Sequence, residues 1–354
     1  MGGHEVDGGH DPTDGQREEG APAGREFSRR DVLKGIAGAG ALLGAGRSVD
    51  SVLLGYGVIV GTNLREQDLG ALADEGFHPG GGRISAGNPG VAARQETIRI
   101  VDGRRAVAAF DPVRTDPGDA EAIGAEHGLG GATSELARDL GALAAGDHAF
   151  EFHGIDGFFE RVRGAEARPY TAGAMRRWHR TADPDRVERF VGASPGNPGA
   201  VVRGLASGFR EHAHYDVARY LAGAVQDNVI MGAADLRAPF REPVGFGALL
   251  ADDGATGMFC YEFTHRSIEA LHAVPAPDQA VPVIGARIID DRHKHVYTGV
   301  ASVVRDGGLR VPMTFVDYTH STMYDDANAR GLLGEGVGAY DDRHRATAIE
   351  WTPF

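Results

Sequence analysis

Cys260, His295 and Asp317 are the residues of this chain whose types and order could carry out covalent chemistry. A thiolate is a strong nucleophile, a histidine can take its proton and later pass one to a leaving group, and a carboxylate can orient the imidazole ring. Together the three would be sufficient for acyl transfer from an amide. Cys260 is the single cysteine of the 354 residues, so the chain cannot form a disulfide within itself.

The elements that would position these side chains can be read from the apolar spacing. A turn at residues 254–259 (GATGMF) precedes Cys260, and a helix is predicted over residues 261–273. Cys260 would then lie in the first turn of a helix, where unpaired backbone N–H groups and the positive end of the helix dipole favour a thiolate. Alternating apolar residues predict three strands after it, at residues 281–289, 295–304 and 309–317.

The hairpin between the last two strands decides whether His295 and Asp317 can meet, because a slip of one residue turns a side chain to the other face. If Asp306 and Gly307 form a two-residue loop, His295 lies opposite Tyr318 and Asp317 points away from it. With a three-residue loop or a bulge, His295 lies directly opposite Asp317, on the same face and about 5 Å away. Catalysis requires the second register. Pro312 cannot donate to a ladder and predicts an irregularity in its strand.

The run GATGMFCYEFTHRSIEALH at residues 254–272, the strand start HVY at residues 295–297 and the strand end FVDYT at residues 315–319 resemble the transglutaminase-like superfamily core. That family has Gly-x-Cys at the helix start, whereas Gly257 here precedes the cysteine by three residues. A predicted helix at residues 215–229 fits the helix that the family places before its cysteine, so the resemblance covers residues 210–320.

This resemblance implies an α+β fold, a papain/transglutaminase-like core in which a helix packs on an antiparallel sheet. It implies that Cys260 is the nucleophile, His295 the base and Asp317 the residue that orients the imidazole. No cofactor and no metal ion are expected. The backbone N–H of Cys260 could be one oxyanion donor, and Gln226 and Tyr215 are candidates for a second.

Other interpretations of these residues stay open. Cys260 could be a buried apolar side chain, and Asp317 could cap the following turn with Thr319. His293 and His295, two apart on a strand, could bind a metal ion with Asp291 or Glu262 as a third ligand. A second polar group, His212, His214 and Asp216, is predicted to open a helix and to be solvated.

Composition limits the possible partners and the source. The chain has 50 acidic and 36 basic residues, a net charge of −14, and only two lysines, Lys34 and Lys294. An acidic surface of this kind keeps proteins apart in high salt, so we expect a haloarchaeal, halophilic source, although solubility or a GC-rich genome would also account for it. The charge argues against nucleic-acid binding, which uses basic patches.

The start of the chain predicts export. Residues 28–34 (SRRDVLK) and the Gly-rich apolar run at residues 35–46 resemble a twin-arginine signal, and the run is too short to span a bilayer. We expect residues 1–47 to be a disordered acidic segment with this signal, residues 48–198 to be a β-rich region of unknown role, and residues 199–354 to be the transglutaminase-like domain. No membrane span is expected in the mature chain.

The sequence therefore predicts an exported, cell-surface or extracellular enzyme that uses a Cys-His-Asp triad. It would hydrolyse an amide or peptide bond, or transfer the acyl group, with a peptide or protein as substrate. The alternative is a non-catalytic exported envelope or binding protein that keeps the fold without the activity. The oligomeric state is not predicted by the sequence.

Overall fold

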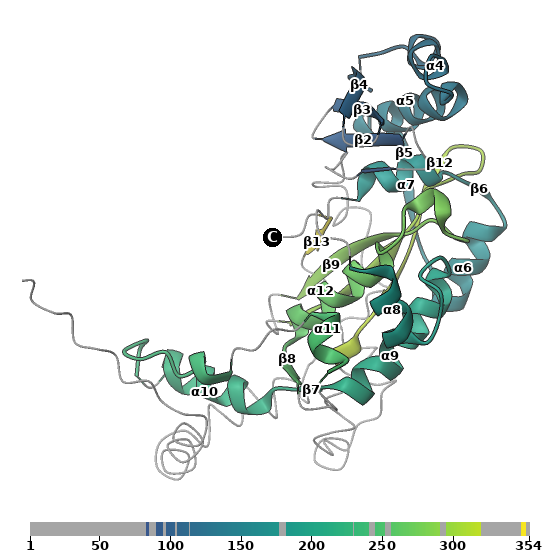
Figure 1. The fold of residues 1–354 in the computed structure, drawn as a ribbon. Coiled ribbons are helices and arrows are strands. Elements are labelled where there is room, and N and C mark those ends of the chain that lie inside the picture. Colours follow the sequence, from purple (N-terminus) through teal and green to yellow (C-terminus); the bar gives the residue numbers. More distant parts are fainter. Residues whose placement is uncertain are drawn as a thin grey trace, which may run out of the picture.

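The computed structural model describes residues 83–84, 90–94, 97–102, 105–112, 114–176, 182–228, 230–240, 245–251, 256–290, 295–319 and 348–351. In Figure 1 a small sheet and two helices occupy one end of the molecule, a larger sheet with helices around it forms the middle, and α10 leads away from the body. The predicted export signal at residues 1–47 lies outside the described residues. Among those that are described, no helix is long and apolar enough to cross a membrane.

The small sheet at the end of the molecule is antiparallel, with its strands in chain order. It consists of β1 (Arg83–Ile84), β2 (Gly90–Arg94), β3 (Thr97–Asp102) and β4 (Arg105–Phe110). β3 and β4 form a hairpin, in which Asp102 pairs with Arg105. Two helices follow it, α4 (Pro117–Ala125) and α5 (Gly130–Ala144).

Five further elements cover residues 148–191. They are β5 (His148–Phe152), α6 (Ile155–Arg163), β6 (Glu166–Ala167), α7 (Pro169–Met175) and α8 (Pro184–Val191). The prediction that residues 48–198 are β-rich is therefore wrong for their described part, which holds five helices beside its six short strands. The helical residues there include many Gly and Ala, which weaken the apolar periodicity from which helices were predicted.

A Gly- and Pro-containing loop at residues 192–197 separates two helices, α8 and α9 (Pro198–His212). Gly192 ends α8 with a φ of 67°, a left-handed conformation that favours glycine. Pro198 occupies the first turn of α9, and the side chain of Asn197 accepts a hydrogen bond from the N–H of Ala200. The local sequence thus specifies both helix ends.

The remaining elements build the middle of the molecule. The helical ones are α10 (Val217–Asn228), η3 (Ala238–Phe240), α11 (Phe246–Leu249), α12 (Cys260–Leu271) and η4 (Ala276–Asp278). The strands are β7 (Ala213–Tyr215), β8 (Thr256–Met258), β9 (Ile284–Asp290), β10 (His295–Ala301), β11 (Val304–Arg305), β12 (Leu309–Val316) and β13 (Ala348–Glu350). The helix predicted at residues 261–273 and the three strands predicted after it are confirmed, apart from small shifts at their ends.

In the part of the chain that the structure describes, the larger sheet has seven strands, and its centre is antiparallel. β10 pairs with β9 on one side and with β12 on the other, and β11 continues the line of β10 along β12. The break at Ser302 and Val303 lies opposite Pro312, whose missing N–H interrupts the ladder there. The irregularity predicted from Pro312 therefore falls on the partner strand, while β12 itself is continuous.

Strands from before residue 198 belong to this same sheet. β5 pairs in parallel with β12, and β6 pairs with β11. Adjacent residues Val300 and Ala301 of β10 point into two different core clusters. The cluster around Ala301 contains residues of α5 and α7, and the cluster around Val300 contains residues of α6, α8, α9 and α12. Both faces of the sheet are covered, and the expected boundary at residue 198 runs through one α+β unit.

Candidate active site

Cys260 is the first residue of α12, directly after the short strand β8. Its side chain is buried, with 8% of the residue exposed. β8 pairs in parallel with β7, and the N–H of Asp216 donates to the carbonyl oxygen of Met258 at 3.1 Å. A Cβ on Gly257 would lie 2.6 Å from Oδ2 of Asp216, so only glycine permits this close approach. Gly257 is thus needed to deliver Cys260 to its position.

Two hydroxyl groups fix α12 against β10. Oγ1 of Thr264 donates to the carbonyl oxygens of Cys260 and Val296, at 2.9 and 3.3 Å. One turn later, Oγ of Ser267 lies 2.5 Å from Oγ1 of Thr298. The later residue of the helix, Ser267, contacts the later residue of the strand, Thr298, so α12 and β10 run side by side in the same direction. The starts of α12 and β10, which carry Cys260 and His295, are therefore at the same end.

His295 and Asp317 form a buried pair at that end. Nε2 of His295 lies 2.7 Å from Oδ2 of Asp317, and their side chains are 2% and 6% exposed. The His295 ring also stacks on Tyr297, with ring centroids 5.7 Å apart. Because Nε2 is engaged by the carboxylate, Nδ1 is the ring nitrogen available for proton exchange with Cys260.

The electrostatics of His295 reflect both neighbours. Burial lowers its pKa, but the charge and hydrogen bond of Asp317, followed by the hydrogen bond and charge of Cys260, raise the pKa from 6.5 to about 10. The thiol is thus close enough to the imidazole to raise its pKa. The three residues singled out in the sequence come together, and at neutral pH the imidazole carries a proton.

The hairpin differs in register from both alternatives considered above. Thr298 pairs with Val316, and Arg305 pairs with Leu309 across a loop of Asp306, Gly307 and Gly308. Continuing this ladder places Asp317 beside Tyr297, two residues from His295. The prediction that His295 lies directly opposite Asp317 is therefore wrong. A shift of two residues nevertheless keeps the side chains of His295 and Asp317 on one face of the sheet. The two residues are diagonal neighbours on adjacent strands, close enough for their side chains to form a hydrogen bond.

A charged cluster beside Cys260 was not identified from the sequence. Glu262 accepts a hydrogen bond from the N–H of Phe259 at 2.7 Å. Both carboxylate oxygens of Glu262 accept from Nη1 of Arg219, at 3.0 and 3.1 Å, and Nη2 of Arg219 donates to the hydroxyl of Tyr261 at 2.7 Å. Arg219 lies 43 residues before Glu262, so no local spacing in the sequence indicates the pair. The sequence does show a glutamate at the third position of the predicted helix, where a carboxylate commonly caps the helix start.

The candidates for a second oxyanion donor lie in different surroundings. The side-chain oxygen of Gln226 accepts from the backbone N–H groups of Leu236 and Arg237, at 2.9 and 3.4 Å, so Gln226 is used in a turn next to α10. Tyr215 pairs with Met258 and packs in the core, close to the turn that carries Cys260. Of the two, only Tyr215 is next to the site.

The second polar group also differs from the prediction. The residues from 213 to 215 form β7 rather than the start of a helix, and Asp216 is 7% exposed, with Oδ1 accepting from the N–H of Arg219 at 2.8 Å. Within the described part of the chain, no three His, Cys, Asp or Glu side chains are grouped so that they could hold a metal ion. His293 and Asp291 lie outside that part, and Glu262 is engaged by Arg219.

Comparison with protein-family models, with curated proteins and with solved structures finds no match for this chain.

Proposed function

We propose that the protein is a cysteine-dependent amide hydrolase or acyltransferase with Cys260 as nucleophile, His295 as acid and base, and Asp317 as the residue that orients the imidazole. The observation that carries the proposal is the buried 2.7 Å contact of His295 with Asp317, in a histidine whose pKa is also raised by Cys260. A buried and correctly ordered set of this kind is what acyl transfer by a thiol requires.

The chemistry follows from these roles. The Cys260 sulfur, having given its proton to His295, attacks the amide carbonyl carbon as a thiolate, and the resulting tetrahedral intermediate expels the amine, which takes a proton from Nδ1 of His295. A thioester remains on Cys260. Water then attacks the thioester while His295 takes one of its protons, and the carboxylic acid leaves as the thiol is restored. An amine in place of water would give acyl transfer; we favour hydrolysis of a peptide or protein, on a papain/transglutaminase-like core.

The test begins with the thiol. The folded protein, in the salt it needs, is treated with iodoacetamide near neutral pH, and the modification of Cys260 is followed by mass spectrometry. We expect faster alkylation than that of a free thiol, and cleavage of bonds in a defined peptide mixture by the wild type but not by Cys260→Ala. A thiol that reacts only after unfolding would support instead a non-catalytic envelope or binding protein.

We also propose that the chain is exported by a halophile through the twin-arginine pathway. The support is residues 28–34 with the apolar run after them, and the net charge of −14. Fractionation of cells that express the full chain tests this. Replacement of Arg29 and Arg30 by lysine should retain the protein in the cytoplasm, and equal export of the variant and the wild type would refute the proposal.

A further inference from the structure

We propose that Arg219 is a positioning residue for Cys260. It neutralises the Glu262 carboxylate, which holds the first turn of α12 in place, and so prevents an uncompensated negative charge from opposing the thiolate. This inference rests on the proposed function, because it concerns the reactivity of the same thiol.

The geometry places the pair at the start of α12. Glu262 is the third residue of this helix, and its side chain turns back to the N–H of Phe259, the residue directly before Cys260. The carboxylate therefore occupies the positive end of the helix dipole, which a thiolate at Cys260 would also use. Without a counter-ion, Glu262 would disfavour a second negative charge two residues away.

Arg219 is built into this position from a different element. Its guanidinium contacts both oxygens of Glu262 and lies 4.3 Å from the centre of the Phe259 ring, while its backbone N–H donates to Asp216 before α10. The Arg219 side chain is 8% exposed and that of Glu262 is 10% exposed, so solvent screens the pair little. Burial lowers the pKa of Arg219, but Glu262 and then Tyr261 raise it more, so the guanidinium keeps its charge.

Nothing else in this cluster supplies the missing positive charge. Tyr261 receives a hydrogen bond from Arg219 and is 3.2 Å from Oε1 of Glu262, and burial raises its pKa, so it stays neutral. The charge of His295 is paired with Asp317. Among the described residues, the titratable and charged groups of this cluster and of the site are Asp216, Arg219, Tyr261, Glu262, His295 and Asp317. Of these described groups, Arg219 is the one whose positive charge contacts Glu262.

The experiment measures the iodoacetamide rate of Cys260 against pH in the full-length protein. In Arg219→Met, which keeps a chain to pack on Phe259, the midpoint of the profile should move up by about one pH unit. At a pH below both midpoints, the alkylation rate of the variant should therefore be about tenfold lower than that of the wild type. Arg219→Lys should keep most of the wild-type profile. In the double variant Arg219→Met with Glu262→Gln, where the amide oxygen can still accept from Phe259, the midpoint should return toward the wild-type value.

Arg203→Met is the matched control, because Arg203 forms an exposed ion pair with Asp156; its profile should equal that of the wild type. If Arg219→Met does not fold, the pH profile of Glu262→Gln by itself tests the inference. We expect the midpoint of that profile to equal the wild-type value or to lie below it. A reactive wild-type thiol whose midpoint is unmoved in Arg219→Met, or raised in Glu262→Gln, would overturn the inference alone. A wild-type thiol that is inert in the folded protein would overturn the proposed function and this inference with it.

Discussion

At the scale of single residues, the site depends on the contact between His295 and Asp317. The protein tolerates the two buried ionisable side chains because each provides the other with an opposite charge and a hydrogen-bond partner. The same pairing sets the chemistry, since it holds Nε2 and, in the proposed mechanism, assigns proton exchange with the thiol to Nδ1. Removing the carboxylate should therefore change both the proton affinity and the orientation of the ring.

Asp317→Asn should lower the rate of peptide cleavage by about a thousandfold or more, because an amide N–H donated to Nε2 would leave the proton on the wrong ring nitrogen. Cleavage rates of the purified variant and the wild type, with far-UV circular dichroism to verify folding, provide the check. Asp156→Asn, at an exposed ion pair, is the control and should retain full activity. Equal losses in both variants would contradict the assigned role.

The pH dependence follows from the pKa of His295, about 10 against an ordinary value of 6.5. A raised pKa means that the imidazole keeps its proton up to about pH 10 and can protonate a leaving amine over that range; cleavage should fall at higher pH. The histidine's contribution to stability is likewise fully present below about pH 6.5 and is lost as the pH rises through 10. NMR titration of the ring nitrogens gives the value directly. A midpoint near 6.5 would show that the pair does not form.

At the scale of elements, the position of Cys260 is set by two packed junctions. The hydroxyls of Thr264 and Ser267 align α12 with β10, and the pairing of β7 with β8 brings the chain to the start of the helix. The second junction requires that Gly257 has no side chain. A change there should affect the nucleophile without touching any of the three site residues.

Gly257→Ala should lower the free energy of unfolding by about 1–3 kcal/mol, because the added methyl group would clash with Asp216 and push β8 away from β7. It should also slow the alkylation of Cys260. Urea unfolding followed by circular dichroism measures the first effect. The matched control is Gly308→Ala, since a Cβ on Gly308 meets nothing within 4 Å. A Gly257→Ala protein as stable as this control would refute the account.

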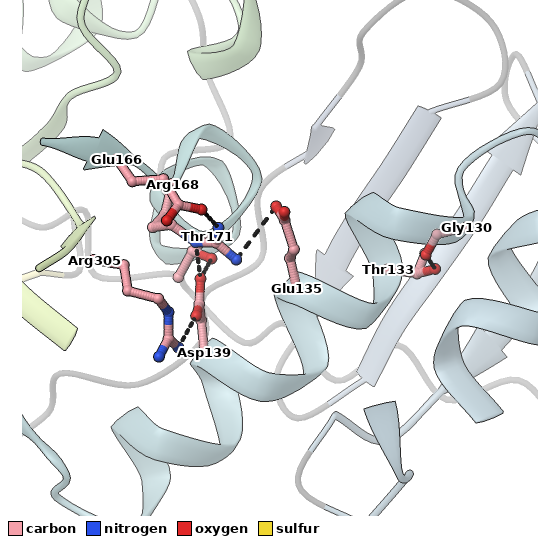
Figure 2. Close-up of polar contacts among 8 residues, drawn as sticks. All are labelled: Gly130, Thr133, Glu135, Asp139, Glu166, Arg168, Thr171 and Arg305. Atoms are coloured by element: carbon pink, nitrogen blue, oxygen red, sulfur yellow. Dashed lines mark hydrogen bonds and ion pairs between the residues drawn. The ribbon is translucent and has the colours of Figure 1, made fainter. Parts of the chain in front are cut away.

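At the scale of the whole molecule, a buried ionic network joins the helices before residue 198 to the sheet that carries the site. Figure 2 shows Asp139 of α5 between Arg168, Thr171 and Arg305. Asp139 is fully buried and accepts hydrogen bonds from all three, each at 2.7 Å. Arg305 belongs to β11, in line with the strand of His295. The N-terminal helices are thus part of the support of the sheet.

Asp139→Asn should destabilise the protein by about 3 kcal/mol or more, because it leaves two arginines without the carboxylate between them. Glu135→Gln is the control: Glu135 also pairs with Arg168, but its side chain is 45% exposed, and its loss should cost about 1 kcal/mol or less. Both values come from urea unfolding at one pH. If the two variants are equally stable, the network does not join the two parts as described.

The sequence by itself determined the local elements and the order of the reactive residues. The helix after Cys260, the strands around His295 and Asp317, and the ends of α8 and α9 follow from apolar spacing and from capping residues, which act over a few positions. The condition that His295 and Asp317 share one face of the sheet was also accessible, since it holds in every register that differs from the observed one by an even number of residues. The α+β class was expected from the resemblance to the transglutaminase-like core.

Only the tertiary structure decided the register itself, the helices before residue 198, the strands that they add to the sheet, and the pair of Arg219 with Glu262. These features join residues tens of positions apart: Asp139 and Arg305 are 166 residues apart, and Arg219 and Glu262 are 43. Such contacts form because a buried charge must find a partner wherever the packing of helices and sheet places one. No spacing within a single element records that choice, so it becomes visible only when the chain is folded.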